Sequence, residues 1–419
     1  MLTFFYATRE KHPTFRVDLT ELFSSELAGK GHRIDWHMPS MKPAPSSVLR
    51  LNDNERVFVG KAYSGNNLLS KLANHAAGLF HDLGIYRLAC KNRYDFIQVR
   101  DKMFAGLVGL IVARRRGIPF FYWMSFPYPE ADIFRSRDRQ LDLSFLLRTF
   151  YRLRGTLTGW LLYHIVLPGA DHIFVQSDQM KKEVADRGIA TKNMTPMPMC
   201  ISLRQVENIK LPSISAPGLE GRLPLIYVGT MVRVRRIDFL IETLKLVRNK
   251  IPEVILVLVG DASKDDMQFL RDEAIRLGVS EHVLFTGFVP MEKAWAYIKL
   301  AKVCLSPIRP SLILDVGTPT KIIEYIVFGR PVVANNHPDQ SKVIGESGAG
   351  HAVDYRPEAF ADAIVDILGN PDKGEAMGRA GIEYVKQHRS YEALSSQLEE
   401  KYLKLVNSYN SSKLAREKS

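Results

Sequence analysis

The sequence predicts an α/β fold with two domains, each a doubly wound, mainly parallel sheet. Three observations lead to this expectation. The chain has 419 residues, more than one hydrophobic core normally holds. Short apolar runs alternate with longer amphipathic stretches, as in successive β-α units. Residues 204–222 are rich in Pro, Ser and Gly and lack periodicity, so they are expected to form a linker between the two domains.

The first predicted domain covers residues 1–203. Its clearest strand-like runs are residues 2–8, 94–100, 118–124 and 171–177. Helical patterns follow these runs, and one of them ends at Gly188. Ligands of parallel sheets bind at the carboxyl ends of the strands. A crevice is therefore expected along the loops that follow Thr8, Arg100 and Met124.

The second predicted domain covers residues 223–389 and repeats the β-α alternation. Its most informative stretch is DVGTPTKIIEYIVFGRPVVANN, at 315–336. Pro319 suits a first helical turn, Thr318 is predicted as its N-cap, and Gly329 as its left-handed stop. The β-branched pair at 332–333 predicts a buried parallel strand.

The start of this helix is expected to bind an anion. Its unpaired N–H groups carry about half a positive charge, and Lys321 stands in the same turn. Glu324, on the next turn, would accept hydrogen bonds from the two hydroxyls of a ribose. The stretch therefore suggests a nucleoside-diphosphate site. The other interpretation is an ordinary loop and helix that contain Pro, Lys and Glu without a ligand.

This stretch resembles the C-terminal signature of retaining glycosyltransferases of the GT-B fold, family 4 (group 1). The resemblance covers nearly the whole chain, most clearly residues 223–352. It implies two Rossmann-like domains whose parallel sheets face each other across a cleft, the first binding the acceptor and the second the nucleotide sugar. It also implies that a helix at 390–410 crosses back to the first domain. Residues 411–419 are expected to be a disordered tail.

The same resemblance implies the donor-binding residues. In the family, the helix glutamate holds the donor ribose, the lysine and loop amides hold its diphosphate, and the backbone near Val289 reads the base. The family's arginine and lysine after the first strand are replaced here by Thr230 and Arg235, and Arg233 is a nearby compensating cation. The expected nucleotide-sugar-binding residues are Gly229, Thr230, Arg233, Arg235, Val289, Pro319, Thr320, Lys321 and Glu324.

The implied reaction moves a sugar from a nucleoside-diphosphate sugar to an acceptor hydroxyl with retention. Arg235 and Lys321 would stabilise the charge of the departing diphosphate, so neither a metal ion nor a cofactor is expected. Val316 stands where the family has a second glutamate, and the neighbouring Asp315 is the proposed substitute. The expected catalytic residues are Arg235, Lys321 and Asp315.

The acceptor side is less clear. The first loop, TREKHPTFR, carries basic residues where other nucleotide-binding loops carry glycines. We expect Arg9, Lys11 and Arg100 to bind the acceptor, with an acceptor phosphate as one possible partner of the loop. A solvated basic loop is the other interpretation. The family's histidine before residue 125 is absent, since Trp123, Met124 and Ser125 occupy that region.

Charge and cysteine content bear on the location. The net charge of +12 indicates a polyanionic partner, but aromatic and basic residues do not form a recognised nucleic-acid module, so nucleic acid is not expected. Three scattered cysteines fit a reducing compartment, and the sequence shows neither a leader nor a spanning segment. The chain is therefore expected in the cytoplasm, peripheral at the inner face of the membrane.

A segment with basic and apolar residues is the basis for the membrane expectation. Residues 135–167 combine Arg135, Arg137, Arg139, Arg148, Arg152 and Arg154 with Phe145, Leu146, Leu147, Phe150, Tyr151, Trp160 and Leu161. A helix of this kind lies in an anionic bilayer interface, which would suit a lipid-linked or surface-polysaccharide precursor such as a polyprenyl-diphosphate acceptor; a soluble saccharide acceptor remains open. The other interpretation is an interior helix pair with one charged face.

Two rival functions remain on the sequence alone. One is a sugar-nucleotide epimerase or hydrolase of the same fold, which would need an acid and base pair in the cleft. The other is a noncatalytic nucleotide-sugar or nucleic-acid binding protein, motivated by the net charge.

Overall fold

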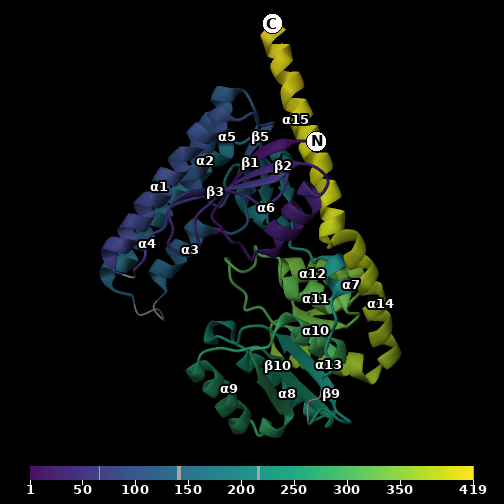
Figure 1. The fold of residues 1–419 in the computed structure, drawn as a ribbon. Helices are drawn as coiled ribbons and strands as arrows, with labels where there is room; N and C mark the ends of the chain where they lie inside the picture. The colour runs from purple at the N-terminus through teal and green to yellow at the C-terminus, as the bar shows by residue number, and fades with distance from the viewer. Residues whose placement is uncertain (66, 139–142, 215–217, 419) are drawn as a thin grey trace. The chain divides into compact units, whose positions relative to one another are not determined.

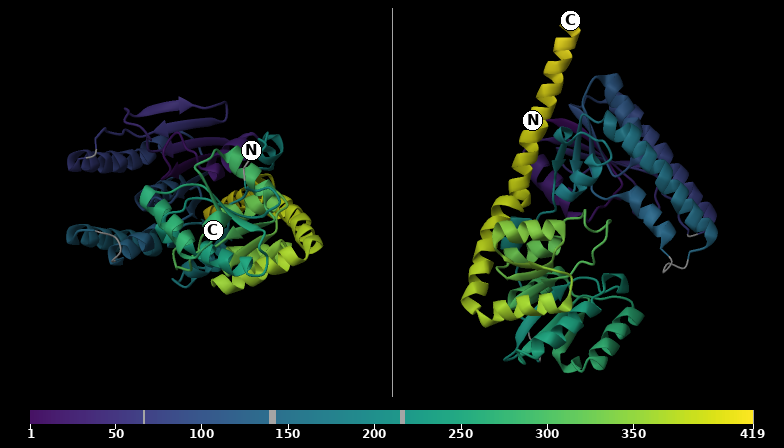
Figure 2. Two further views of the ribbon diagram at one scale, coloured as in Figure 1. Left: turned by 90° about the horizontal axis from the view of Figure 1, so that it is seen from below. Right: turned by 180° about the vertical axis from the view of Figure 1, so that it is seen from behind.

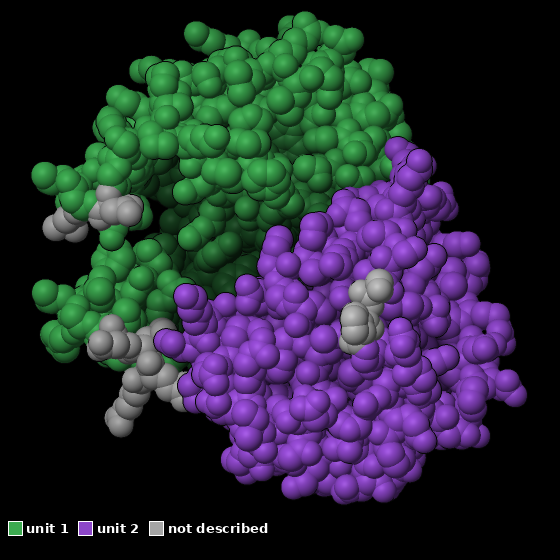
Figure 3. Space-filling view, turned by 60° about the horizontal axis from the view of Figure 1, so that its bottom comes forward, with its two compact units in different colours: residues 1–198, 394–419 green, residues 199–393 purple. Residues whose placement is uncertain are grey.

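The structure, a computed structural model, describes residues 1–65, 67–138, 143–214 and 218–418. The chain divides into two compact units, coloured separately in Figure 3. Unit 1 comprises residues 1–198 and 394–419, and unit 2 comprises residues 199–393. Each unit contains one sheet. The predicted α/β class with two mainly parallel sheets is confirmed.

The sheet of unit 1 has eight strands in the order β3-β4-β2-β1-β5-β6-β7-β8. The pairs are parallel except for the edge pair β3–β4, which is antiparallel. The strands are β1 (Thr3–Thr8), β2 (Arg33–Met38), β3 (Ser47–Arg50), β4 (Glu55–Val59), β5 (Phe96–Arg100), β6 (Phe120–Met124), β7 (His172–Val175) and β8 (Met194–Pro196).

Helices cover this sheet (Figure 1). They are η1 (Asp18–Ala28), α1 (Leu68–Lys91), α2 (Met103–Arg116), α3 (Tyr128–Arg137), α4 (Phe145–Leu161), η2 (Leu162–Val166), α5 (Leu167–Gly169), α6 (Asp178–Ala185), the short η3 (Thr191–Asn193) and the C-terminal α15 (Tyr391–Lys418). No strand or helix was predicted between residues 39 and 90. The structure places β3, β4 and the 24-residue α1 there.

Unit 2 has six parallel strands in the order β11-β10-β9-β12-β13-β14. They are β9 (Leu223–Val228), β10 (Val254–Val259), β11 (Val283–Gly287), β12 (Val303–Ser306), β13 (Val332–Asn335) and β14 (Gly350–Val353). The helices are α7 (Leu203–Asn208), η4 (Arg233–Arg235), α8 (Asp238–Arg248), α9 (Lys264–Arg276), η5 (Ser280–His282), α10 (Met291–Leu300), α11 (Thr320–Val327), α12 (Pro338–Ser347), α13 (Pro357–Gly369) and α14 (Pro371–His388).

Alternation along β9 gives the unit 2 sheet two buried faces. Leu225 and Tyr227 face a core that includes residues of α8, α9 and α13, while Ile226 faces a core that includes residues of α10, α11 and α12. The connections run outward from β9 in opposite directions, so the strand order reverses between β9 and β12. Ligands of doubly wound sheets bind at the carboxyl ends of the strands beside such a reversal.

Two predicted boundaries are wrong. The supposed linker 204–222 is in part α7, capped by the Ser202 hydroxyl, and its apolar residues pack on the core of unit 2. Its polar composition concealed this spaced apolar set, which consists of Leu203, Val206, Ile209, Leu211, Ile214 and Leu219. The predicted tail 411–419 is helical through Lys418, because α15 continues without a break. Residues 215–217 of the predicted linker and residue 419 lie outside the described part of the chain.

The helix α15 belongs to unit 1 from Leu394 onward and completes its core. Tyr402 is fully buried among four phenylalanine rings of β1, β5, β6 and β7, with centroid distances between 4.7 and 6.0 Å. Its hydroxyl donates to Gln98 Oε1 at 2.7 Å. The last helix of the chain therefore supplies a central side chain of the first domain.

Tyr402→Ala is expected to lower the free energy of unfolding of unit 1 by about 3–5 kcal/mol, because it leaves a large cavity among the rings. Tyr402→Phe should cost about 1 kcal/mol, since only the hydrogen bond to Gln98 is lost. Urea unfolding followed by circular dichroism measures both. Leu414→Ala, at a site on the same helix that is 57% exposed, is the control and should change stability little. Equal effects of Tyr402→Ala and Leu414→Ala would show that α15 does not complete this core.

Candidate functional site

The helix α11 starts at the carboxyl edge of the unit 2 sheet. Its N-cap is Pro319, and no side chain among the described residues caps its N–H groups. Thr318 was predicted to be the cap, but its hydroxyl accepts a hydrogen bond from the Met199 N–H at 2.9 Å. The left-handed stop at Gly329, with φ +70°, is as predicted. The first turn therefore keeps donors that are free to meet an anion.

Lys321 reaches from this first turn to the end of β9. Its Nζ donates to Tyr227 Oη at 2.9 Å and lies 4.3 Å from the centre of the Tyr227 ring. A β-carbon at Gly229 would lie 2.2 Å from Nζ, so only glycine leaves room for the ammonium group. Burial lowers the pKa of Lys321, and the charge of Arg235 lowers it further. The lysine is thus a cation that lacks a full set of counter-charges.

Glu324 lies one turn further along α11. Burial raises the pKa of its carboxyl group, while the charge of Lys321 and the indole of Trp295 act in the opposite direction. Trp295 is 3% exposed on α10. A carboxylate held in such surroundings favours polar partners that can donate to it. Hydroxyl groups of a ligand would serve this purpose.

The ends of β9 and β10 meet closely beside Lys321. The Gly229 N–H donates to the Val259 carbonyl at 2.8 Å. At Gly260, with φ +138°, a β-carbon would lie 2.1 Å from the Gly229 carbonyl oxygen. Glycine is therefore required at both strand ends, where the two backbones and the Lys321 ammonium group approach each other closely.

The turn after β9 carries the predicted basic residues. Arg235 is exposed, and its charge acts on Lys321. Arg233 instead stacks on Phe269 of α9, with its guanidinium 3.9 Å from the ring centre, so the structure gives no support to its role as the compensating cation.

The same turn is held by Arg236, which was not predicted as a site residue. Arg236 has φ +53° and forms a salt bridge with Asp238, which fixes the turn. The side chain of Thr230 is exposed, and its carbonyl accepts from Tyr227 Oη at 3.2 Å.

Two further predicted residues lie on loops of the same unit. Asp315 Oδ1 accepts from the Ser311 N–H at 3.4 Å, within the loop that precedes α11. Val316, at the position of the family's second glutamate, is 1% exposed. Val289 follows β11, and its side chain packs against the core that α10 and α11 share. Tyr227 and Trp295 were not predicted as site residues, because buried aromatic residues are usually part of the core.

The predicted acceptor residues lie in unit 1. Arg9 and Lys11 line a cavity of about 440 Å³ at the carboxyl end of β1, and the Arg9 guanidinium lies 4.0 Å from the centre of the Tyr128 ring. Arg100 does not contact this cavity. It is fully buried and paired with Asp18, so its assignment as an acceptor-binding residue is wrong. Arg100 is buried because it is the last residue of the central strand β5 and does not lie on an exposed loop.

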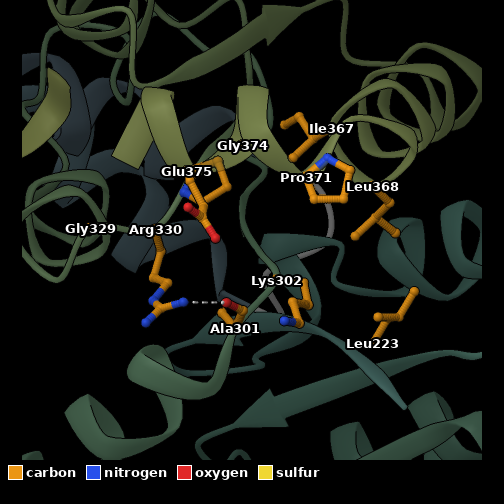
Figure 4. A pocket seen from close by; sticks show the side chains of 11 residues that line it. Leu223, Ala301, Lys302, Gly329, Arg330, Ile367, Leu368, Pro371, Gly374 and Glu375 are labelled. Atoms are coloured by element: carbon orange, nitrogen blue, oxygen red, sulfur yellow. Dashed lines mark hydrogen bonds between the residues drawn. The ribbon is translucent and has the colours of Figure 1, made fainter. Parts of the chain in front are cut away.

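A separate cavity of unit 2, of about 180 Å³, lies at the amino-terminal ends of the strands (Figure 4). Its lining includes Leu223, the first residue of β9, while Gly229 lies just beyond the other end of that strand. Arg330 donates to the Ala301 carbonyl at 3.3 Å beside it. This cavity is therefore distinct from the Lys321 site.

The described residues contain no group of three or more His, Cys, Asp or Glu side chains arranged to hold a metal ion. No helix among them combines the length and the apolar character needed to span a bilayer.

Two family models match the chain. The one described as Glycosyltransferase Family 4 matches residues 19–205, and the one described as Glycosyl transferases group 1 matches residues 222–370. A GDP-mannose-dependent alpha-(1-6)-phosphatidylinositol monomannoside mannosyltransferase of Mycobacterium tuberculosis is 30% identical over 183 residues. That match covers 43% of this chain and 47% of the relative, so it spans about half the length of each.

Solved structures with a similar fold cover nearly the whole chain. Sucrose-phosphate synthase of Thermosynechococcus elongatus has a TM-score of 0.66 at 18% identity, with 97% of this chain and 100% of that one covered. Anabaena Alr3699/HepE in complex with UDP has a TM-score of 0.64 at 14% identity, with 96% and 99% covered. At these identities the likeness concerns the fold.

The charges around Lys321 predict how its pKa responds to substitution. Arg235→Gln should raise the pKa of Lys321, because a repelling cation is removed. Glu324→Gln should lower it, because an attracting carboxylate is removed. Titration of the ¹³C-dimethylated lysines by NMR measures both shifts. The resonance of Lys250, which precedes β10 at the other edge of the sheet, is the control and should not respond. Shifts of the same sign in both variants would contradict this arrangement of charges.

Proposed function

Because the chain belongs to the group 1 glycosyltransferases of family 4, which have the GT-B fold, we propose that it moves a sugar from a nucleoside-diphosphate sugar to an acceptor hydroxyl. The observation that carries the proposal is the position of Lys321. Its ammonium group stands beside Gly229, at the strand reversal and next to the open start of α11. Fixed positive groups converge there on one small volume, as a diphosphate requires.

Each part of the donor has a proposed partner. The diphosphate would lie at Pro319 and Thr320, with Lys321 and Arg235 as its cations, close to the backbone at Gly229 and Thr230. The ribose hydroxyls would donate to Glu324, and the base would lie near the backbone of Val289. A relative that is GDP-mannose-dependent and a structural neighbour in complex with UDP support a nucleoside-diphosphate sugar as the class of donor.

We propose transfer with retention at the anomeric carbon and without a metal ion. Charge builds on the departing diphosphate, and Lys321, Arg235 and the unpaired N–H groups at the helix start would stabilise it. We assign no protein base, because the leaving phosphate can take the proton of the acceptor hydroxyl on the same face of the sugar. Asp315 is proposed to contact the hydroxyls of the donor sugar, since the neighbouring Val316 is buried and apolar.

The function test starts from a thermal-shift screen of nucleotide sugars, which identifies the donor. Glu324→Ala should then abolish transfer, because the ribose loses its carboxylate partner. Lys321→Ala and Arg235→Ala should each lower kcat by about 10²-fold, as removal of one donor to a developing anion does. Activity should persist in excess EDTA, because side chains supply the positive charge.

Glu358→Ala and Lys293→Ala are matched controls for this test, because both residues are exposed in unit 2. They should leave kcat unchanged. Near wild-type turnover in correctly folded Glu324→Ala would refute the proposed donor site, and a loss in EDTA that Mg²⁺ restores would refute the metal-independent mechanism. The anomeric configuration of the product, measured by NMR, checks retention.

We further propose that unit 1 contacts a membrane through α4 and α1. Each helix carries six or seven large apolar side chains that are between 42% and 79% exposed. On α4 they are Phe145, Leu146, Leu147, Phe150, Leu153, Leu157 and Trp160, and on α1 they are Leu69, Leu72, Leu79, Phe80, Leu83 and Tyr86. The N-terminal ends of both helices project from the sheet on the same side (Figure 2).

The arginines beside α4 fall into two groups. Arg148 donates to the carbonyl of Asp138 at 2.7 Å, and Arg154 pairs with Asp132, so these two hold α3 and α4 together. Arg135, Arg137 and Arg152 are exposed and remain for anionic head groups. Arg139, in the predicted basic set, lies outside the described residues. Since the apolar face of α4 is exposed, an interior helix pair does not describe this segment.

Sedimentation with liposomes tests this contact. Wild-type protein should bind vesicles that contain anionic lipid more strongly than neutral ones, and high salt should weaken binding, since each basic residue contributes about 1 kcal/mol. Leu146→Glu combined with Leu157→Glu should abolish binding. Ile275→Glu, at a site on α9 of unit 2 that is 65% exposed, is the control for an added carboxylate. Equal binding of the double variant and the control would rule out α4 as the membrane contact and favour a soluble acceptor.

A further inference from the structure

A second cavity of unit 1 adjoins the one at Arg9. It has a volume of about 250 Å³ and lies at the carboxyl ends of β2 and β4, between the segments that follow these strands, α1 and the start of α2. Lys11 and Met41 line both cavities. Four lysines contribute to its lining, so we call this cavity the lysine pocket. Its lining includes Lys11, Lys42, Lys61, Lys102, Tyr63, Asn74, Gly78 and His81.

Positive charge dominates the lysine pocket. Lys102 is paired with Asp82. Lys11, Lys42 and Lys61 are exposed, and within the described residues no carboxylate lies within salt-bridge distance of them. Lys61 Nζ lies 4.4 Å from the centre of the Tyr63 ring. An anion bound in the lysine pocket would therefore meet positive charge from several of its walls.

The wall of the lysine pocket is fixed by hydrogen bonds. The Asn74 side chain on α1 accepts from the Tyr63 N–H at 2.8 Å and donates to the Tyr63 carbonyl at 3.1 Å. The segment that carries Lys61 is thereby tied to α1. Ordered walls of this kind reduce the entropy that a bound ligand must overcome.

The lysine pocket has a neutral histidine on one side. His81 stacks on the buried His37 at 3.6 Å and bonds the Met38 carbonyl through Nε2 at 3.1 Å. Burial, with a smaller effect of Lys102, lowers the pKa of His81 to about 4, so its ring carries no charge near neutral pH. A β-carbon at Gly60 would lie 2.8 Å from this ring, so glycine is needed for it to fit. The positive charge of the pocket therefore comes from its lysines.

We propose that the lysine pocket binds a phosphoryl group of the acceptor. The inference rests on the proposed function, because the pocket continues the acceptor crevice at the strand reversal beside β1. A compact dianion with several acceptor oxygens matches three flexible ammonium donors.

The helix α1 indicates that this phosphoryl group is carried by a lipid. One face of α1 contributes Asn74, Gly78 and His81 to the lysine pocket. Another face presents the exposed apolar stripe that includes Leu72, Leu79 and Leu83. An amphiphile with its phosphate in the pocket would have its hydrocarbon chain in the bilayer that this stripe contacts.

Calorimetric titration with inorganic pyrophosphate tests the pocket. The titration is done in Lys321→Ala protein, so that pyrophosphate bound at α11 does not obscure the result. Adding Lys42→Ala and Lys61→Ala should weaken the remaining binding by at least about tenfold, the effect of losing one charged hydrogen bond. Lys42→Arg with Lys61→Arg should retain it.

Lys91→Ala with Lys192→Ala is the control, because both lysines are exposed in unit 1 outside the lysine pocket and the change of net charge is the same. Unchanged binding in the pocket variant, or equal weakening in the control, overturns the proposal. Lys321→Ala alone should remove only the part of the pyrophosphate binding that belongs to the donor site, and no loss would count against that site alone. Complete loss in Lys321→Ala protein would overturn the lysine pocket, so failures of the two proposals are distinguishable. Thermal unfolding of each variant verifies that it is folded.

Vesicles separate a lipid phosphate from a free one. Phosphatidylcholine vesicles receive a minor fraction of phosphatidic acid, with a phosphomonoester, or of phosphatidylglycerol, with a phosphodiester. Lys42→Ala with Lys61→Ala should reduce binding to the first more than to the second, and pyrophosphate should compete only with the first. Equal reduction on both vesicles would show general charge attraction and overturn a specific site. Weakened pyrophosphate binding with unchanged vesicle binding would overturn the lipid source.

Discussion

The buried ammonium group of Lys321 is the constraint on which the arrangement of unit 2 depends. It occupies the space that a side chain at Gly229 would fill and donates to Tyr227, so it joins the start of α11 to the end of β9 and to the turn that follows β9. Burial and the charge of Arg235 lower the pKa of Lys321, and Tyr227 and Glu324 only partly offset them. A bound dianion would stabilise the charged form of Lys321, so the features that lower its pKa within the protein suit the proposed diphosphate.

Unit 1 also contains a buried cation, but there the protein itself supplies the counter-charge. The guanidinium of Arg100 is fully buried at the end of β5, and its counter-charge is supplied internally by Asp18. Burial alone would raise the pKa of Asp18, but the charges of Arg100 and Arg16 lower it to about 2. Arg16 closes the first loop, so this buried pair holds the segment that carries Arg9 and Lys11. Arg100 therefore holds the first loop in place through Asp18 and does not line the cavity beside Arg9 and Lys11.

The sequence was most informative where local rules decide the structure. The apolar spacing on α11 and the stop at Gly329 follow from backbone geometry and periodicity, and both were predicted. Thr318 and Arg100 were misjudged because their partners are distant in the chain, at Met199 and Asp18. Arg233 likewise contacts a residue, Phe269, that its position in the sequence does not reveal. A residue type at a given spacing reveals what it can bind, but which of several partners it reaches is decided by packing. Tyr227 and Trp295 were not predicted as site residues for a related reason: in the sequence, an aromatic residue beside a ligand site looks the same as one in the hydrophobic core.

The helix α1 was missed because apolar residues occur on two of its faces. Ile85 and Ala89 are buried, while Leu69, Leu79 and Phe80 are exposed, so the helix lacks the polar face that periodicity analysis requires. In a soluble helix the second apolar face is unfavourable unless something covers it. The proposed membrane contact supplies that cover. It also explains why the lysines gather on the segments beside α1, since charged side chains at the edge of an apolar face can meet phosphate groups at the bilayer surface. The physical feature that concealed the helix from sequence analysis is thus the one that suits an amphiphilic acceptor.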